Sequence, residues 1–543
     1  MTLWLQTYDP LHQVAGSTLV AALPLLFFIV TLAIFRWRLH WAALGTLLLA
    51  AVIAVTVYGM PVASVAAAAL YGFGYGLWPI VWIVAGVVFL YRLTVKSGQF
   101  EIVRASIVSV TPDARLQMIL IGFAFNAFLE GAAGYGTPVA ITAALLVGLG
   151  FDPLRAAALC LIANTAPVAF GAMGTSITVA AQVSHTDLAA LTAIAGTLLP
   201  LFSLLTLGWI ITSLSGWRGA RDIWPALLVA SVSFAGTMMA TALWLGPQLP
   251  AITASIVCMA AMVVLLRYWQ PSKMMLLREH TPIYPAMIDT PPLTARRIAY
   301  AWLPFAVLTV CVVVWGNKGF QSWFAPGGML AETTRWLDVP FLHGVVYKIA
   351  PVVEGKALYP AVFKFDIIGA VGTGIFLSTL LSAAFLRWRP KFVLGVLKET
   401  CLGLRTTVLT IGLVLAFAAL SNYSGMSATL ALALADSGKI YPLLAPALGW
   451  FGVFLTGSDT SSNALFAPLQ ATVAHQIGVS ETLLVAANML GGAAGKMISP
   501  QSIAVACVAV GLMGREAAML RATLRASVVF AIVAGIVIFA IQM

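Results

Sequence analysis

The chain has 543 residues, of which 61% are hydrophobic and 9% are charged, whereas about a quarter of the residues in a soluble domain are charged. This composition excludes an ordinary soluble domain and predicts an integral membrane protein. The excess of 29 Lys and Arg over 18 Asp and Glu is better explained by basic cytoplasmic loops than by nucleic-acid binding.

The first part of the chain is predicted to hold three spanning helices. Apolar runs at residues 14–35, 41–59 and 63–93 are each long enough to cross a bilayer, which takes about 20 residues. Arg36 and Arg38 follow the first run. By the positive-inside rule this loop is cytoplasmic, and the N-terminus is expected outside.

An apolar segment at residues 115–150 is interrupted by the sequence EGAAGYGTP, Glu130 to Pro138. Arg115 precedes the interruption and Arg155 follows it, so both ends of the segment are predicted to lie inside. Each half is too short to span comfortably. A re-entrant hairpin therefore accounts for this segment.

The middle of the chain is predicted to hold further spans and two long connections. The spans are expected at residues 155–183, 188–214, 224–245, 251–268 and 298–315. Residues 270–297 are rich in Pro and basic side chains, which predicts a cytoplasmic linker. Residues 316–365 are predicted to form an outer loop that is long enough to have structure of its own.

The last part continues the pattern of spans around a second interrupted segment. Spans are expected at residues 366–386, before Asn422, at 482–510 and at 524–541, with the interrupted segment at 440–478. The predicted fold is an all-α polytopic membrane protein with about twelve transmembrane helices, two re-entrant hairpins and both termini in the periplasm. Its predicted divisions are an N-terminal helix (1–40), a first repeat (41–216), connecting helices (217–365) and a second repeat (366–543).

Four short matches, in the same order, relate the two halves at an offset of about 324 to 328 residues. They pair Ser97-Gly98 with Ser424-Gly425, Phe128 to Gly131 with Phe454 to Gly457, Ala163-Asn164 with Ala487-Asn488, and Gly171 to Met173 with Gly495 to Met497. The first interrupted segment begins inside and the second outside, so the repeats are predicted to be inverted, as in many secondary transporters. No GxxxxGK[ST] nucleotide motif occurs in the sequence, which favours a gradient over ATP as the driving force.

Four polar interruptions, two in each repeat, combine Gly or Pro with hydroxyl and amide side chains. They are residues 130–138, 163–176, 456–463 and 487–502. Helix ends that are broken at membrane depth must find partners or line a watery cavity, and their free N–H groups favour a carboxylate. The set predicts one central substrate site, although capping or packing is the simpler explanation for any single Ser or Thr.

Three charges lie alone in apolar surroundings, namely Glu130, Asp459 and Lys496. A charge at the centre of a spanning helix costs about 2.5 to 3.5 kcal/mol on insertion scales, so each requires a reason. We interpret Lys496 as the group that attracts an anionic substrate, and Glu130 or Asp459 as the carrier of a coupling proton. The alternatives are that Glu130 caps a helix near an aqueous vestibule and that Lys496 forms a structural ion pair with Asp459.

The substrate-binding candidates are the polar side chains of the interruptions. They are Thr137, Asn164, Ser461, Ser462, Asn463, Asn488, Lys496, Ser499 and Gln501. No catalytic residue, metal site or cofactor is expected, because an HExxH motif is absent and the six histidines are scattered. The five cysteines lie singly in apolar surroundings and are interpreted as packing residues.

Several longer stretches carry a resemblance to a known family. They are LYGFGYGLWPI (Leu70 to Ile80), FLEGAAGYGTPVAITAALLVGLGF (Phe128 to Phe151), NTAPVAFGAMG (Asn164 to Gly174), FKFD (Phe363 to Asp366), SNYSG (Ser421 to Gly425), FLTGSDTSSNALF (Phe454 to Phe466) and GKMISPQSIA (Gly495 to Ala504). Together they closely resemble the bacterial lactate permease family, which includes lactate and glycolate permeases. The resemblance implies proton-coupled uptake of lactate and related short 2-hydroxymonocarboxylates across the bacterial inner membrane, and inverted repeats with paired re-entrant hairpins.

One departure from the family pattern lies in the first interruption. Where GFGAPV is expected in relatives, this chain has GYGTPV at residues 134–139, which adds the hydroxyls of Tyr135 and Thr137. If the tip of the hairpin faces the substrate, we expect selectivity between lactate and glycolate to differ, and the substrate class to stay the same.

The same polar residues are compatible with other functions. A sodium-coupled carrier or a carrier of another organic anion is the main alternative, because hydroxyls and unwound carbonyls also suit sodium. A membrane-embedded enzyme is disfavoured by the absence of metal-ligand clusters, and a channel would not concentrate its substrate. The expected partners are the carboxylate substrate, the proton and the lipid bilayer, with no nucleic acid, and a homo-oligomer is compatible with the sequence.

Overall fold

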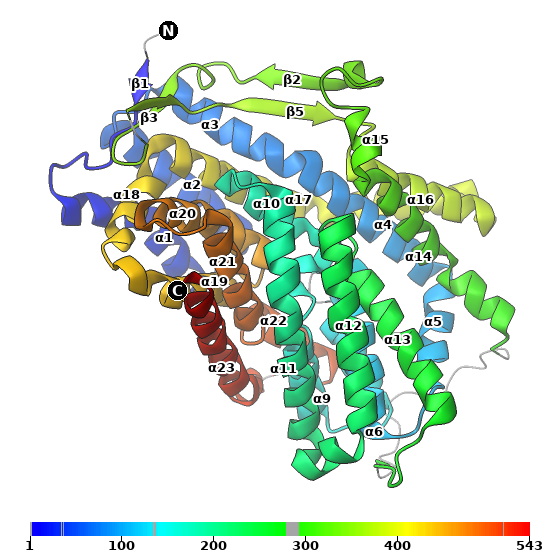
Figure 1. The fold of residues 1–543 in the computed structure, drawn as a ribbon. Coiled ribbons are helices and arrows are strands. Elements are labelled where there is room, and N and C mark those ends of the chain that lie inside the picture. Colours follow the sequence, from blue (N-terminus) through cyan, green and yellow to red (C-terminus); the bar gives the residue numbers. More distant parts are fainter. Residues whose placement is uncertain are drawn as a thin grey trace.

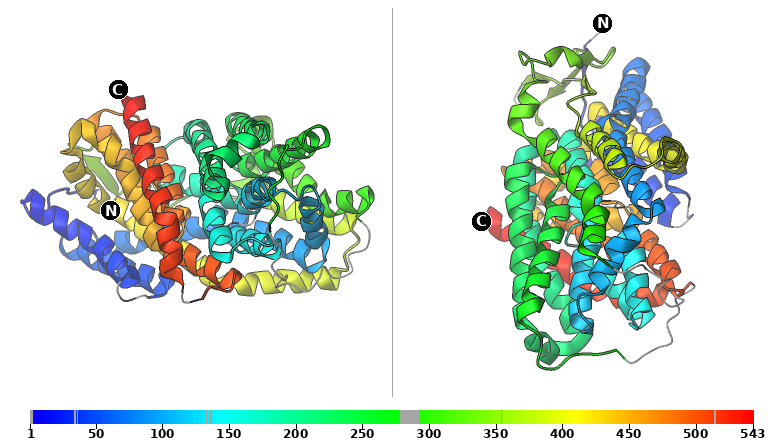
Figure 2. Two further views of the ribbon diagram at one scale, coloured as in Figure 1. Left: turned by 90° about the horizontal axis from the view of Figure 1, so that it is seen from below. Right: turned by 90° about the vertical axis from the view of Figure 1, so that its right-hand side faces the viewer.

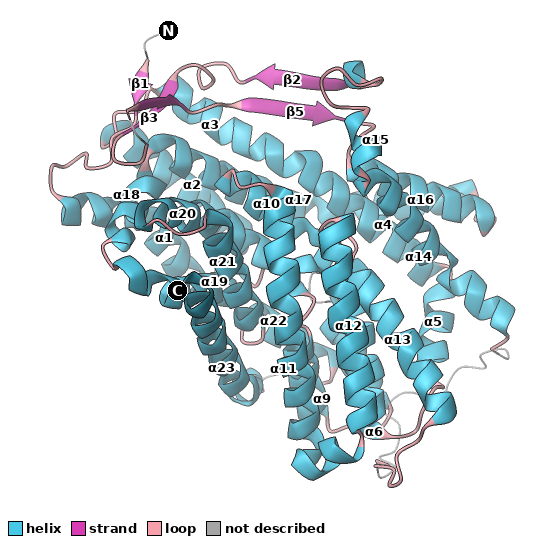
Figure 3. Cartoon of the chain, viewed as in Figure 1, coloured by secondary structure: helices cyan, strands magenta, loops and turns pink. Residues whose placement is uncertain are grey.

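The protein is a bundle of helices with a few short strands at one end (Figures 1 and 3). The computed structural model describes residues 3–33, 35, 37–132, 134, 137–277, 293–353, 355–513 and 515–543. Within this part of the chain, ten helices are long and apolar enough to cross a membrane, or eleven if the bent pair Pro153–Ala163 and Val168–Ser184 forms one span. The number and length of these helices confirm the predicted class, a mostly helical polytopic membrane protein.

The first half of the chain contributes the following helices. They are α1 (Val14–Ala33), α2 (Leu39–Thr56), α3 (Val62–Tyr75), η1 (Gly76–Val81), α4 (Trp82–Lys96), α5 (Gln99–Val108), α6 (Ala114–Gln117), η2 (Met118–Phe125), α7 (Asn126–Ala132), α8 (Thr137–Gly148), α9 (Pro153–Ala163), η3 (Val168–Phe170), α10 (Gly171–Ser184), α11 (Leu188–Asp222), α12 (Trp224–Leu245) and α13 (Pro250–Tyr268). Most of the predicted linker, residues 278–292, lies outside the described residues.

The second half contributes the remaining helices of the described residues. They are α14 (Ala295–Gly316), α15 (Lys318–Ser322), η4 (Ala331–Thr333), α16 (Val371–Phe385), α17 (Pro390–Ser424), α18 (Met426–Ala435), η5 (Gly438–Ile440), α19 (Tyr441–Thr456), α20 (Asp459–Ile477), α21 (Glu481–Lys496), α22 (Pro500–Ala509) and α23 (Glu516–Gln542). Seen from below, the helices of the two chain ends, blue and orange to red, gather on one side, and the green helices of the middle lie on the other (Figure 2).

Three of the predicted spans differ from the structure. The span predicted at 155–183 is two helices, α9 and α10, bent by 70° at the polar stretch between them. The span at 482–510 is divided into α21 and α22, because Pro500 starts a new helix capped by Ser499. The span at 366–386 is the 15-residue α16, which is short for a bilayer.

The second interrupted segment is a helix, a two-residue break and a second helix. Gly457 ends α19 in the left-handed conformation, with φ of +70°, which glycine adopts at no steric cost. Ser458 then caps α20, because its Oγ accepts a hydrogen bond from the backbone N–H of Ser461 at 3.2 Å. The chain therefore reverses between α19 and α20 without leaving these helix ends unsatisfied.

The bent pair α9 and α10 is joined by an unusual turn at the start of α10. Ala172, Met173 and Gly174 are consecutive and left-handed, with φ of 43°, 58° and 68°. Residues other than glycine pay about 1 kcal/mol or more for this conformation, and such strain concentrates at functional sites. The turn is buried, with Ala172 on the wall of a cavity, and it holds the first residues of α10 away from a regular helical path.

The strands lie together at one end of the molecule (Figure 3). They are β1 (Trp4–Leu5), β2 (Thr334–Asp338), β3 (Val346–Ile349), β4 (Lys356–Leu358) and β5 (Val362–Asp366). The N-terminal strand β1 pairs in parallel with β3, which pairs with β4, while β2 and β5 form an antiparallel ribbon. The segment at residues 316–365 thus has structure of its own, as predicted, and it also pairs with β1 near the start of the chain.

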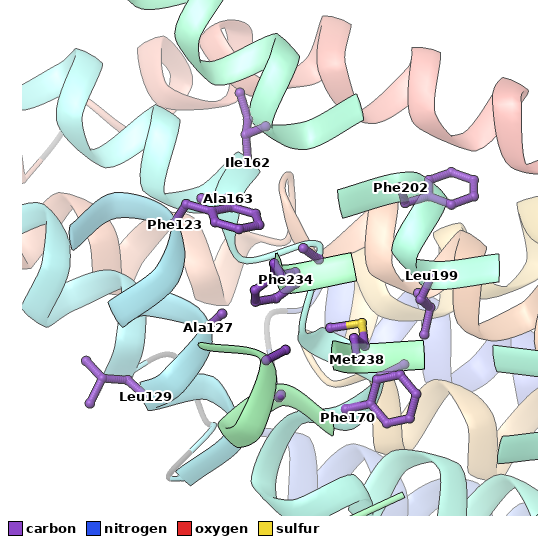
Figure 4. Close-up of a cluster of buried hydrophobic side chains, with 14 of the residues drawn as sticks. Phe123, Ala127, Leu129, Ile162, Ala163, Phe170, Leu199, Phe202, Phe234 and Met238 are labelled. Atoms are coloured by element: carbon purple, nitrogen blue, oxygen red, sulfur yellow. The ribbon is translucent and has the colours of Figure 1, made fainter. Parts of the chain in front are cut away.

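Close helix crossings bring the broken segments together. The backbone of α19 meets α21 where Gly449, Gly491 and Gly495 have no side chain, and a Cβ on Gly491 would lie 1.7 Å from the carbonyl oxygen of Pro446. Around the first interrupted segment, Phe170, Phe234 and other buried side chains form a continuous apolar core (Figure 4). These contacts place the four polar interruptions next to one another.

Candidate functional site

A single large cavity reaches all four polar interruptions. Its volume is about 1140 Å³, and it extends to the α1–α2 loop and to the first turn of α23. The predicted site residues on its wall are Glu130, Asp459, Ser461, Lys496 and Gln501. The three isolated charges of the sequence therefore share one water-accessible space.

Glu130 and Lys496 form an ion pair between the two halves of the chain. Lys496 Nζ lies 3.6 Å from Glu130 Oε1, and both residues are buried. Asn164 donates from its Nδ2 to the second carboxylate oxygen, Glu130 Oε2, at 3.0 Å, and to Asn126 Oδ1 at 3.2 Å. Glu130 is therefore held by one cation and one amide.

Asp459 is held differently, by neutral donors alone. Its Oδ2 accepts hydrogen bonds from the hydroxyl of Ser176 and from Asn463 Nδ2, the latter at 3.3 Å. Asn488 in turn donates to Asn463 Oδ1 at 2.8 Å. Among the described residues, no Lys, Arg or His lies within ion-pair distance of Asp459, and its Oδ1 has no hydrogen-bond partner.

Two glycines make room for the two carboxylates. A Cβ on Gly171 would lie 2.6 Å from Glu130 Oε1, and a Cβ on Gly492 would lie 2.1 Å from Asp459 Oδ1. In each half, then, a backbone without a side chain lies against the acid. The position of each carboxylate depends on this absence of a Cβ.

The polar candidates divide into lining and supporting residues. Asn164, Asn463 and Asn488 are not among the cavity-lining residues. Asn164 donates to Glu130, Asn463 donates to Asp459, and Asn488 supports Asn463. Ser462 donates to the carbonyl oxygen of Gly449 at 3.3 Å. Ser499 caps α22 and donates to Ser502, so it too is explained by capping.

Other predicted residues need separate comment. Gln501 lies on the cavity wall, and a Cβ on Gly457 would lie 2.3 Å from its Oε1, so it covers the turn between α19 and α20. Thr137 begins α8, but its side chain, like the whole of Tyr135, is outside the described part of the structure. The alternative pairing of Lys496 with Asp459 is wrong as an ion pair, because Glu130 is the carboxylate within 4.0 Å.

Two contributors were missing from the predicted set. Ser176 binds Asp459 across the interface of α10 and α20, and Asn126 accepts from Asn164 and donates to the carbonyl oxygen of Cys160 at 2.9 Å. Ser176 ends a polar stretch that the sequence marks, and Asn126 is an isolated amide in an apolar run. Among the described residues, no three His, Cys, Asp or Glu side chains gather into a group able to hold a metal ion.

Comparison with known proteins identifies the family. A family model described as L-lactate permease matches residues 17–543. The chain belongs to the L-lactate permease family. The family that the sequence resemblance implied is thereby confirmed.

Individual relatives agree with this membership. The chain is 50% identical to the glycolate permease GlcA of Escherichia coli K12, over 99% of this chain and 98% of that protein. It is 49% identical to the L-lactate permease of the same strain, over 99% of this chain and 98% of that protein. A solved structure of the YdaH transporter of Alcanivorax borkumensis covers 81% of this chain and 87% of its own, with 14% identity and a TM-score of 0.34, too low to carry an argument.

Proposed function

We propose that the protein is a proton-coupled symporter that takes up lactate, glycolate and related short 2-hydroxymonocarboxylates across the bacterial inner membrane. Its family and the names of its relatives support the substrate class. The observation that carries the proposal is the cavity in which the Glu130–Lys496 pair and Asp459 lie together.

Lys496 is the binding group for the substrate carboxylate in this proposal. Its ammonium lies on the cavity wall and is already oriented by Glu130 at 3.6 Å. In the empty site Glu130 acts as a counterion, which avoids a buried unpaired cation. A substrate carboxylate then binds the same ammonium, with the hydroxyl of Ser461 and the N-terminal N–H groups of α20 nearby.

Asp459 is the proton carrier in this proposal. A buried carboxylate without a cationic partner is costly to keep charged, and protonation removes that cost. Glu130 has Lys496 at 3.6 Å, whereas the partners of Asp459 among the described residues are a hydroxyl and an amide. When a substrate anion and a proton enter together, the net charge of the site is unchanged. The loaded site can therefore move through the membrane at little extra electrostatic cost.

The proposed architecture is a pair of inverted repeats, residues 41–216 and 366–543, with re-entrant hairpins at 115–150 and 440–478. Supporting this, Gly98 and Gly425 end α4 and α17 in the left-handed conformation, with φ of +76° and +91°. In each half, an interrupted hairpin, a broken helix and a long helix then follow in the same order. The basic loops, including Arg38, are assigned to the cytoplasm, and the sheets and both termini to the periplasm.

The test is uptake of labelled lactate into proteoliposomes under an inward proton gradient. We expect accumulation above equilibrium, and its loss in Asp459→Asn, which keeps the size of the side chain and cannot bind the coupling proton. Exchange of labelled for unlabelled lactate without a gradient should persist in this variant, because the substrate site is intact. Accumulation by folded Asp459→Asn at the wild-type level would remove Asp459 from the coupling step.

A second candidate, coupling to sodium, has one observation in its favour. Asp459 Oδ1 and Asn488 Oδ1 are buried oxygens without a hydrogen-bond partner among the described residues, and both belong to residues joined through Asn463. Oxygen acceptors of this kind also bind hard cations. The same liposomes under a sodium gradient alone separate the two candidates, since accumulation driven by sodium and not by protons would replace the proton.

A further inference from the structure

A second, smaller cavity lies at the end of the molecule that carries the sheets. Its volume is about 170 Å³, and its wall includes Lys348 of β3, His185 at the end of α10, Tyr359, Asn422 and the pair His475–Glu481. One water molecule occupies about 30 Å³ in the liquid, so the cavity has room for a small organic anion and little else. It shares no wall residue with the central cavity.

Lys348 brings a positive charge to the wall of this cavity. Its ammonium lies over the ring of Tyr359, 4.1 Å from the centroid, and no carboxylate of the described residues lies within ion-pair distance of it. Glu481, the acid on the same wall, is 3.3 Å from His475 Nδ1. Burial lowers the pKa of Lys348, against the opposing effect of Glu481, which indicates a cation that lacks sufficient solvation.

The group under the ammonium is rigidly held. The ring of Tyr359 stacks on Tyr423 at 4.3 Å, and its hydroxyl lies 3.2 Å from His185 Nε2. His185 adopts a left-handed backbone with φ of 57°, an uncommon conformation for a residue with a side chain. Burial and the charge of Lys348 lower the pKa of His185 to about 4, so its ring is neutral near pH 7 and leaves the ammonium as the attraction for an anion.

Two helices, α10 and α20, extend from the small cavity to the central site. Helices α10 and α20 pack against each other, with Ser176 and Asp459 at their inner ends, and His185 and His475 at their outer ends. The other wall is closed by the N-terminal segment, where Gln6 Nε2 donates to the carbonyl oxygens of Asn422 at 2.7 Å and Tyr423 at 2.9 Å. A ligand in the small cavity therefore lies at the outer end of the interface that separates it from Asp459.

We propose that the cavity around Lys348 binds a small carboxylate, as a docking site that the substrate occupies on the sheet side before it reaches the central cavity. The inference rests on the proposed transport of short hydroxy acids and adds a second binding site for them. Lys348 supplies the charge and the rigid Tyr359 platform holds it in place. Passage to Asp459 then requires α10 and α20 to separate.

Equilibrium binding of lactate to the purified protein in detergent tests the second site directly. In Lys496→Ala, where the central site lacks its cation, we expect residual lactate binding that disappears in the double variant Lys496→Ala/Lys348→Gln. The matched control is Lys496→Ala/Lys356→Gln, because Lys356 also lies over a tyrosine ring, 4.4 Å from the centroid of Tyr347, but is exposed and off the cavity. Loss of all binding in Lys496→Ala alone, or equal binding in both double variants, would overturn the proposal.

Transport kinetics provide an independent test of the docking site. In oriented proteoliposomes, Lys348→Gln should raise the KM for lactate added on the sheet side by about tenfold, the loss of roughly one charged hydrogen bond, and should leave the KM from the opposite side unchanged. Lys348→Arg keeps the charge and should retain most of the affinity for lactate. This variant is the control that separates loss of the charge from a general folding defect. An equal change from both sides would contradict a one-sided docking site, whereas wild-type protein that transports no lactate at all would contradict the proposed function.

Discussion

At the scale of single residues, the polar stretch that reverses the chain between α19 and α20 has two separate tasks. Thr456 and Ser458 satisfy the ends of the two helices, since Thr456 Oγ1 accepts from the N–H of Ser458 at 3.2 Å and Ser458 caps α20. Asp459 and Asn463 point into a different network, with Ser176 and Asn488. Residues next to each other in sequence are thus divided between building the break and forming the site.

The ion pair of Lys496 predicts how the protein responds to loss of its cation. Lys496→Ala should weaken lactate binding at the central site by about tenfold to a hundredfold, because a hydrogen bond to a charged group is worth about 1.5 to 3 kcal/mol. Lys496→Arg should lose less of its affinity for lactate, because arginine keeps the positive charge. The dissociation constant is measured by competition against labelled lactate, and an unchanged value in Lys496→Ala would exclude this residue as the anchor of the carboxylate.

Glu130 predicts a different defect. In Glu130→Gln the empty site keeps Lys496 as a buried cation without its counterion, so we expect lactate to bind still and net accumulation to be lost, because the unloaded carrier must move an unpaired charge. Binding and accumulation are measured on the same preparation. Full accumulation by this variant would show that the pair has no part in the transport cycle.

At the scale of elements, the start of α10 depends on a glycine whose surroundings leave no room for a side chain. Gly174 has φ of +68°, and a Cβ there would lie 2.2 Å from the carbonyl oxygen of Pro247. The left-handed turn therefore joins α10 to the chain just before α13, and it sets the position of Gly171 beside Glu130. This contact links the packing of the helices to the geometry of the carboxylate.

Substitution of this glycine should lower stability and disturb the site together. We expect Gly174→Ala to lower the free energy of unfolding by about 1 to 3 kcal/mol, as overpacking and a strained φ do. Gly208→Ala is the control, since nothing lies within 4 Å of a Cβ there and the residue is in the interior of α11. Thermal unfolding in detergent compares the two, and equal melting temperatures would mean that the turn around Gly174 adapts freely.

At the scale of the whole molecule, the central cavity extends to the α1–α2 loop and to the start of α23. Its wall reaches residues 37–40 and Glu516, whereas the small cavity lies at the sheets, with the packed helices α10 and α20 between them. The proposed topology, in which the basic loops are cytoplasmic, assigns the end with residues 37–40 to the cytoplasm.

Labelling of a cysteine in the cavity checks this orientation. In a background that lacks the exposed Cys401, Thr406→Cys on the cavity wall should react with a membrane-impermeant maleimide added on the cytoplasmic side, and lactate should slow the reaction. Thr400→Cys on the same helix is the control, because Thr400 is buried and off the cavity. Labelling of Thr406→Cys only from the periplasmic side would reverse the proposed orientation.

The linear sequence was sufficient to determine the class of protein, its family and the group of residues at its centre. Hydrophobic runs and isolated charges report the cost of polar groups in lipid, and this cost depends on local composition. Glu130, Asp459 and Lys496 are therefore recognisable from the sequence as candidate site residues, and the structure places all three on one cavity wall. Glycine and proline in the polar stretches likewise marked the breaks between α9 and α10 and between α21 and α22.

Only the tertiary structure decided how these groups divide their work. Lys496 pairs with Glu130, Asn164 donates to Glu130, and Lys348 lines a cavity together with His185 and His475. These are contacts between residues far apart in the chain. Composition cannot predict them, because each depends on the angles at which helices cross and on where a glycine lets two backbones meet. Burial determines the desolvation free energy of a charged side chain. The partner across the helix interface determines whether a favourable interaction offsets it.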